Sequence, residues 1–165
     1  TPRLRKEGRR GARGPGQRRL LLLRGRRRRR QPPRALLAHP QPLVQRVVAH
    51  CRQAGLAQGL REVSAPDSTF RDRDLYVSGH DDQHRLVCLS AASSTRSLGS
   101  DESELQDGAG MPIVRRIVEV GRAGGGWLDY TFRNPATGEL APKISFVQRH
   151  EGVNFLCGVY KPVSF

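Results

Sequence analysis

The chain has 165 residues, a length that suits one domain and leaves little room for a second. Its net charge of +14 would by itself suggest a nucleic-acid or membrane partner. Residues 1–34, however, hold fifteen basic side chains and one acid, Glu7, and so account for the whole excess. The remainder of the sequence is neutral, so its function cannot be inferred from basicity.

The basic segment, residues 1–39, is expected to be a disordered tail, because like charges repel one another and its one apolar run is Leu20–Leu23. That run is too short for a signal peptide, and no stretch approaches the roughly 20 apolar residues of a transmembrane helix. Three interpretations of Arg26–Arg30 stay open: an arm that binds nucleic acid, a patch attracted to anionic lipid, or translated sequence upstream of the true start. A tail that is non-native or merely solvated is the preferred interpretation.

The folded part is expected to span residues 40–165. Apolar residues recur at helical spacing from Leu43 to Cys51, which predicts a long N-terminal helix. Gly55 interrupts this pattern, and the turn-forming cluster Ser64–Ser68 ends its continuation.

Two strands are predicted next, over residues 74–79 and 85–91, because both segments are rich in apolar and β-branched residues. His80 and His84 flank two aspartates between these strands, a grouping that could suggest a metal site. No Cys-x-x-Cys or His-Glu-x-x-His spacing accompanies them, so a solvated polar hairpin is favoured and no metal is predicted. Residues 92–110 show no periodicity and are predicted to form a long loop.

A helix is predicted over residues 111–123, because Pro112 suits its first turn and apolar residues recur on one face. Gly124–Gly126 ends the helix. This glycine run follows a helix and precedes a strand, which is the reverse of the order in a nucleotide-binding loop, so a helix end and turn are favoured.

Three further strands are predicted over residues 127–133, 143–150 and 154–161, separated by turn sequences. Five antiparallel strands with helices on one side describe an α+β domain of PAS-like shape. The expected fold is therefore a five-stranded antiparallel sheet with a long N-terminal helix and a helix packed on one face.

The stretch Gly124–Pro162 reads GGGWLDYTFRNPATGELAPKISFVQRHEGVNFLCGVYKP. It resembles the C-terminal half of a single Cache domain of the small bacterial type, with its Gly-Gly-Gly-Trp-x-Asp-Tyr strand, Asn-Pro turn, Pro-Lys-x-Ser strand and closing Gly-x-Tyr-Lys. Upstream, the segments Asp74–Val77, Leu98–Ser100 and Leu105–Gly126 match the order of the family's motifs. The resemblance spans about residues 43–162.

Three positions depart from the family's pattern. Ala91-Ala92 stands where members often have His-Pro, the region around Gln83 replaces a hairpin glycine, and Phe146 stands where members often have Tyr. We therefore expect the polarity of the pocket to differ from that of typical members.

The resemblance implies an extracytoplasmic sensory domain that binds a small organic ligand, such as a short carboxylate, in signal transduction or chemotaxis. Such domains are stand-alone periplasmic proteins or the input modules of membrane receptors and kinases, and this chain is expected to be a stand-alone form or a fragment. No catalytic residue and no cofactor are predicted. The alternative is a protein that binds nucleic acid or an anionic surface through its arginine-rich tail. Deleting residues 1–34 distinguishes the two functions. A sensory domain would keep its affinity for the small molecule, whereas a protein that binds through its tail would lose its affinity for polyanions.

A carboxylate site needs one or two fixed cationic or hydrogen-bonding donors within aromatic and apolar walls. The candidate ligand-binding residues are Trp127, Tyr130, Lys143 and Tyr76. Strand alternation places Trp127 and Tyr130 on opposite faces, so only one of these two aromatic side chains can face the pocket squarely. The alternative remains open that the aromatic residues belong to the core and that Lys143 is a solvated charge at a strand end.

The cysteines Cys51, Cys88 and Cys157 lie in apolar stretches and are predicted to be buried free thiols. The resemblance implies that the first strand lies between the second and the fifth. Cys88 and Cys157 would then flank the strand that contains Tyr76 and Val77, roughly 9–10 Å apart. A disulfide requires Cα atoms within about 7 Å, so these two thiols should not pair.

Overall fold

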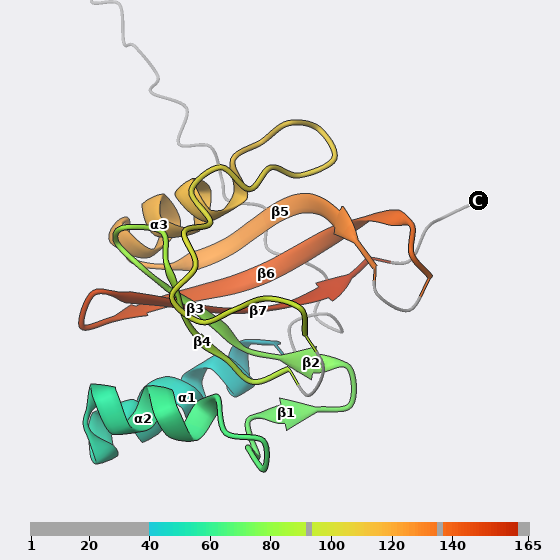
Figure 1. Cartoon of the computed structure of the whole chain (residues 1–165). Coiled ribbons are helices and arrows are strands. Elements are labelled where there is room, and N and C mark those ends of the chain that lie inside the picture. The colour runs from blue at the N-terminus through green and yellow to red at the C-terminus, as the bar shows by residue number, and fades with distance from the viewer. Residues whose placement is uncertain (1–39, 92–93, 135–136, 162–165) are drawn as a thin grey trace, which may run out of the picture.

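A computed structural model of the chain describes residues 40–161, except residues 92–93 and 135–136 (Figure 1). The predicted tail, residues 1–39, lies outside the described residues. In the part that is described, no helix is long and apolar enough to cross a bilayer.

The first half of the domain is a helical pair followed by short strands. Gly55, at φ +85°, separates the two helices, as its place in the apolar pattern predicted. The elements are α1 (Pro40–Ala54), α2 (Leu56–Val63), β1 (Arg71–Asp72), β2 (Leu75–Tyr76), β3 (Ser78–Asp81) and β4 (Leu86–Leu89).

The second half contains one helix and the three longest strands. The helix begins after Pro112 and buries one face that includes Ile113 and Ile117. The elements are α3 (Ile113–Arg122), β5 (Gly126–Arg133), β6 (Leu140–His150) and β7 (Val153–Tyr160).

Five strands form one antiparallel sheet in the order β4-β3-β7-β6-β5. The α+β, PAS-like prediction is confirmed, and the strand β3 lies between β4 and β7, as expected for the first, second and fifth strands. Gly79 pairs with Cys88 on one side and with Phe155 on the other. All three cysteines are buried and free.

The first sheet strand differs from the prediction of residues 74–79. Leu75 and Tyr76 pair instead with Asp72 and Arg71 in a separate two-stranded ribbon, which Arg73 closes at φ +56°. The strand of the main sheet therefore starts at Ser78 and continues to Asp81. The local turn explains the shift, because it pairs Leu75 and Tyr76 before the sheet begins.

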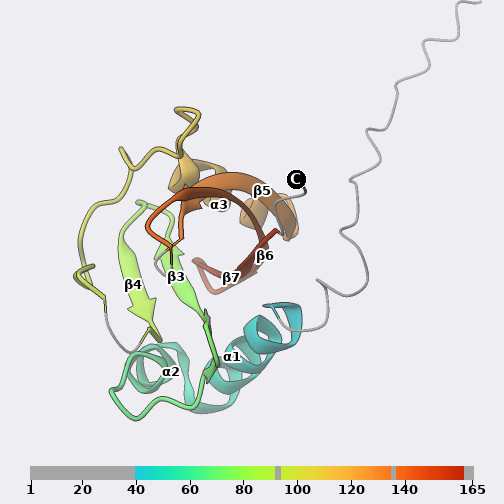
Figure 2. The same cartoon turned by 90° about the vertical axis from the view of Figure 1, so that its right-hand side faces the viewer.

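The helices cover both faces of the sheet, so the expectation that they lie on one side was wrong (Figure 2). Phe155 and Cys157 of β7 join the core cluster of α1, whereas Leu156 between them joins the cluster of α3. Successive side chains of a strand point to opposite faces. Since residues Val153–Cys157 are all buried, the sheet needs an apolar cover on each side.

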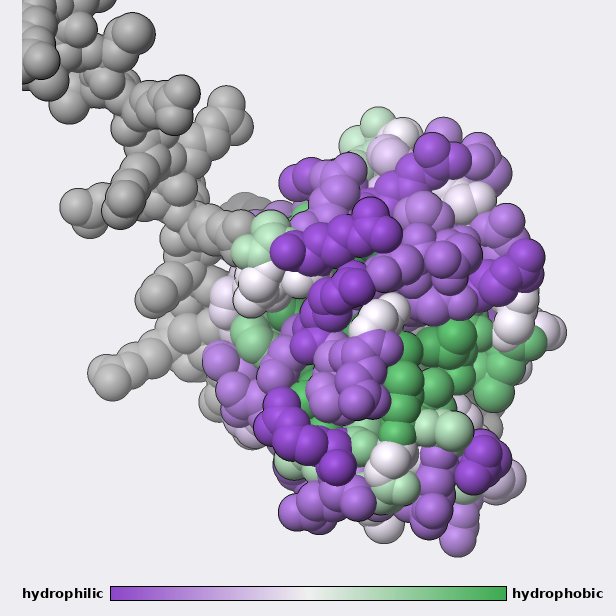
Figure 3. Space-filling model, turned by 90° about the vertical axis from the view of Figure 1, so that its left-hand side faces the viewer, coloured by the Kyte–Doolittle hydropathy of each residue, from purple (hydrophilic) through white to green (hydrophobic). Residues whose placement is uncertain are grey.

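The face shown in Figure 3 is mainly hydrophilic and carries an apolar area between its hydrophilic regions. The apolar faces of the helices are turned inward, where they bury Val47 and Val48 of α1 and Val114 and Ile117 of α3.

Candidate ligand-binding site

A cavity of about 40 Å³ lies between the sheet, α3 and the β4–α3 loop, which is the described part of residues 90–112. The sheet contributes nine lining residues: Ser78, His80, Tyr130, Phe132, Lys143, Ser145, Leu156, Cys157 and Gly158. Other elements contribute Tyr76 from β2, Arg96 and Leu105 from the loop, and Ile113 and Ile117 from α3. This volume corresponds to about three water-sized spheres, so the cavity suits a ligand of few atoms.

Lys143 is the charged group on the sheet side of the cavity, and only 6% of its surface is exposed. Its Nζ lies 4.9, 5.4 and 5.7 Å from the ring centres of Tyr160, Tyr76 and Phe132. Burial, followed by the charge of Arg96, lowers the pKa of Lys143 to about 8. Among the described residues no carboxylate pairs with this ammonium group, which therefore has aromatic neighbours but no counter-ion.

Hydroxyl groups provide neutral hydrogen-bonding partners beside this cation. The hydroxyls of Tyr130 and Ser145 lie 2.8 Å apart on neighbouring strands. Burial raises the pKa of Tyr130 and of Tyr76, so both phenols stay protonated at neutral pH.

Arg96 and His80 form another wall of the cavity, and both bond to Glu102, which lies outside the lining. Arg96 donates from Nε and Nη2 to the two carboxylate oxygens of Glu102, at 3.0 and 2.7 Å. His80 Nε2 lies 2.6 Å from Glu102 Oε2, and since a carboxylate cannot donate, His80 is the donor. Its Nδ1 is buried without a hydrogen-bond partner in the described part of the chain.

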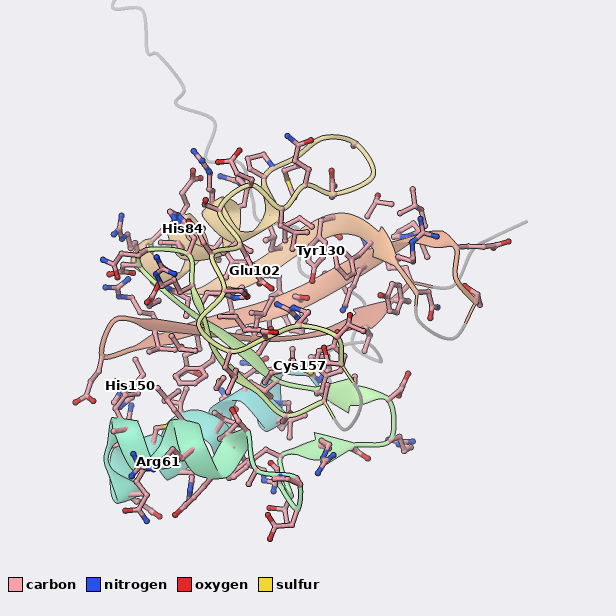
Figure 4. All side chains as sticks on the ribbon, viewed as in Figure 1. Arg61, His84, Glu102, Tyr130, His150 and Cys157 are labelled. Carbon is pink, nitrogen blue, oxygen red and sulfur yellow. The ribbon has the colours of Figure 1, made fainter. Side chains whose placement is uncertain are left out.

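Ionisation in this network follows from the same contacts. Burial lowers the pKa of His80 despite the neighbouring carboxylate, so the imidazole is neutral at pH 7. Burial opposes ionisation of Glu102, but hydrogen bonds from His80 and Arg96 outweigh it, and the pKa of Glu102 falls to about 2. Glu102 on the loop and Tyr130 on β5 both lie between α3 and the sheet (Figure 4).

Three of the four residues proposed from the sequence line this cavity: Tyr76, Tyr130 and Lys143. Trp127 does not belong to its lining, because strand alternation turns it to the other face of β5. There its ring packs against Phe146, with the ring centres 5.3 Å apart. Phe146, one of the departures from the family pattern, is therefore also absent from the cavity lining.

The sequence analysis missed Arg96, Glu102 and His80. The interpretation of the His80 region as a solvated hairpin was wrong for His80 itself, which lies on β3 and is 1% exposed. Extending the predicted strand by two residues would have placed Ser78 and His80 on one face by alternation. No group of three metal-binding side chains occurs among the described residues.

A larger groove of about 660 Å³ adjoins the cavity and shares Tyr76, Arg96 and Phe132 with it. Its remaining lining includes Gln106 and Leu140, so it is partly polar and partly apolar. The shared residues lie at the boundary between the two spaces.

The sheet order and the cavity together define a PAS-like α+β domain with a small internal cavity. The family described as Single Cache domain 2 matches residues 47–161. The chain belongs to this family of sensory, ligand-binding domains. Comparison with curated protein sequences gave no match.

Solved structures share the fold at low sequence identity. The chain is similar to a periplasmic sensor domain of a chemotaxis protein (24% identity, TM-score 0.57, 74% of this chain and 88% of that chain). It is also similar to a structure described as the basis for carboxylic acid recognition by a Cache chemosensory domain (22%, 0.58, 74% and 90%). A third is a methyl-accepting chemotaxis protein from Vibrio parahaemolyticus RIMD 2210633 (18%, 0.50, 73% and 77%).

Proposed function

We propose that this chain is an extracytoplasmic sensory domain that binds a small carboxylate in the cavity and passes the signal to a membrane receptor or kinase, without catalysing a reaction. Membership of the Cache family supports a sensory role. Similarity to a periplasmic sensor domain supports the location, and similarity to a Cache domain that recognises carboxylic acids supports the ligand class.

The observation that carries the proposal is the buried Lys143 ammonium group, which has no counter-ion among the described residues. With a pKa of about 8, this group is about nine-tenths protonated at pH 7. A buried charge is costly unless it is paired, and a carboxylate in the cavity would supply the missing partner. The hydroxyls of Tyr130 and Ser145 could donate to the same anion. The small volume favours acids of about two or three carbons.

Calorimetric titration with propionate and propionamide tests the proposal, because these molecules have similar shapes and differ in charge. Propionate should bind at least about tenfold more tightly, as expected for one hydrogen-bonded ion pair. Its affinity should decline as the pH rises above about 8, because Lys143 loses the proton that binding requires.

Lys143→Met should remove propionate binding. Lys161→Met is the matched control, because Lys161 is partly exposed and pairs with Asp129 outside the cavity. Equal affinity for propionamide, or full binding by Lys143→Met, would contradict the proposed ligand class. Recovery of the native protein in the cytoplasmic fraction of cells would contradict the proposed location.

A further inference from the structure

The cavity has two cationic side chains on its walls, and one of them, Arg96, is already paired with an acid. Arg96 uses two of its donor groups, Nε and Nη2, on the paired oxygens of Glu102. This side-on pair is the strongest arrangement that a guanidinium group makes with a carboxylate. Lys143, by contrast, has no acid partner in the described part of the chain.

Glu102 is held firmly in this position. The side chain is 12% exposed and also accepts a hydrogen bond from His80, whose side chain is 2% exposed. The backbone N–H of Glu102 donates to the carbonyl oxygen of His84, at 3.0 Å, which ties the loop to the β3–β4 turn. The carboxylate therefore cannot swing away to leave Arg96 for a ligand without breaking several hydrogen bonds.

The charges of the cavity wall and of the acid bonded to it add up to one positive charge at neutral pH. Lys143 and Arg96 line the cavity and are cationic, and Glu102, which pairs with Arg96 outside the lining, is anionic. His80 is neutral, and the Tyr76 and Tyr130 phenols keep their protons. A ligand with one negative charge neutralises this site, whereas a ligand with two charges leaves one of them buried without a partner and close to Glu102.

We propose that Glu102 is a specificity-determining residue: by occupying Arg96 it limits the cavity to ligands with a single carboxylate. This inference rests on the proposed function, since it assigns the charge of the ligand at the same site. Glu102 acts through Arg96 and is therefore a positioning residue for the ligand.

The test compares propionate, butyrate and malonate on the full chain by calorimetric titration. Butyrate controls for size, because it is close to malonate in length but carries one charge. The wild-type protein should prefer butyrate to malonate. In Glu102→Gln the freed guanidinium group can bind the second carboxylate, so the malonate-to-butyrate affinity ratio should rise at least about tenfold.

Glu104→Gln is the matched control. Glu104 lies in the same loop and also pairs with an arginine, Arg115, but its side chain is 85% exposed and lies outside the cavity lining. Its replacement removes the same charge from the chain and should leave the affinity ratio unchanged. The double variant Arg96→Gln/Glu102→Gln should return to the wild-type preference, because the gain depends on Arg96.

The outcomes separate this inference from the proposed function. If the wild type binds no propionate, the proposed function fails. A wild type that binds propionate but shows equal affinity for malonate and butyrate would contradict only the role of Glu102. The same holds for a malonate-to-butyrate affinity ratio that is equal in wild type and in Glu102→Gln. If Glu102→Gln does not fold, the single variant Arg96→Gln provides the test. In this variant the negative charge of Glu102 is no longer paired with Arg96, so propionate should bind at least about tenfold more weakly. Unchanged binding would overturn the inference.

Discussion

Replacing Lys143 by methionine should stabilise the fold at neutral pH while it removes the binding site. The lysine is 6% exposed, and burial lowers its pKa from 10.5 to about 8. A lowered pKa means that the folded protein holds the proton less tightly than the unfolded chain does. Below pH 8 the folded state therefore carries the full cost of the buried charge, which corresponds to about 3 kcal/mol.

The sign of the pH dependence follows from the same difference. Between about pH 8 and 10.5 the unfolded chain keeps its proton while the folded protein releases it, so wild-type stability rises with pH relative to the variant. The methionine variant lacks this group. Removing the charge alone should favour the variant by about 3 kcal/mol at pH 7 and by less than about 1 kcal/mol at pH 10. Loss of the contacts with the rings of Tyr76, Phe132 and Tyr160 costs about 1–2 kcal/mol at either pH, so the net advantage at pH 7 should be about 1–2 kcal/mol and should disappear by pH 10.

Urea unfolding of both proteins at pH 7 and pH 10, in the absence of carboxylate buffers, measures this quantity. Comparing the two proteins at each pH cancels the contributions of other titrating groups. Lys161→Met, which removes a partly exposed lysine, should change stability by less than about 1 kcal/mol at either pH. A difference between wild type and Lys143→Met that does not vary with pH would refute the reasoning, because it would mean that the charge is not buried in the folded state.

Further predictions concern packing, thiols and the acid range. Gly158→Ala should destabilise the fold by about 1–3 kcal/mol in thermal unfolding, because the added Cβ would lie 2.9 Å from the carbonyl oxygen of Ile144. A variant as stable as the wild type would show that the two strands can move apart to accommodate the methyl group. In mass spectrometry, Cys88 should resist alkylation in the folded protein and react after unfolding, because burial raises its pKa; rapid native labelling would argue against its burial. Asp82→Asn should lower stability above pH 4, and the difference from wild type should shrink as the pH falls below that range in acid titrations. The hydrogen bond from Arg149 lowers the pKa of Asp82, so its stabilising contribution is lost as the carboxylate is protonated.

The strands that carry the family motifs could be predicted well from the sequence because each has a clear pattern. Tyr130 and Lys143 came from separate predicted strands, and the structure pairs them directly in the register of β5 and β6. Lys143 also pairs with Tyr160 across β6 and β7. Alternation within β5 correctly separated Trp127 from Tyr130, but it could not decide which of the two faces the cavity.

The other wall of the cavity could not be predicted because long-range contacts position it. Arg96 and Glu102 lie in a loop without periodicity, and Glu102 bonds to His80, which lies 22 residues earlier in the chain. Periodicity also identifies the apolar face of a helix without identifying the face of the sheet that it covers. For this reason the apolar stripe of α1 was predicted correctly, while its position opposite α3 was not.

The alternation along β7 has a mechanical consequence for the whole domain. Gly158 lies in the wall of the cavity, its neighbour Val159 packs against the core on the α1 side, and Cys157 belongs to both the cavity lining and that core. The backbone of one strand therefore separates the cavity from the core that α1 covers, so a change in the position of this strand would affect both faces of the sheet.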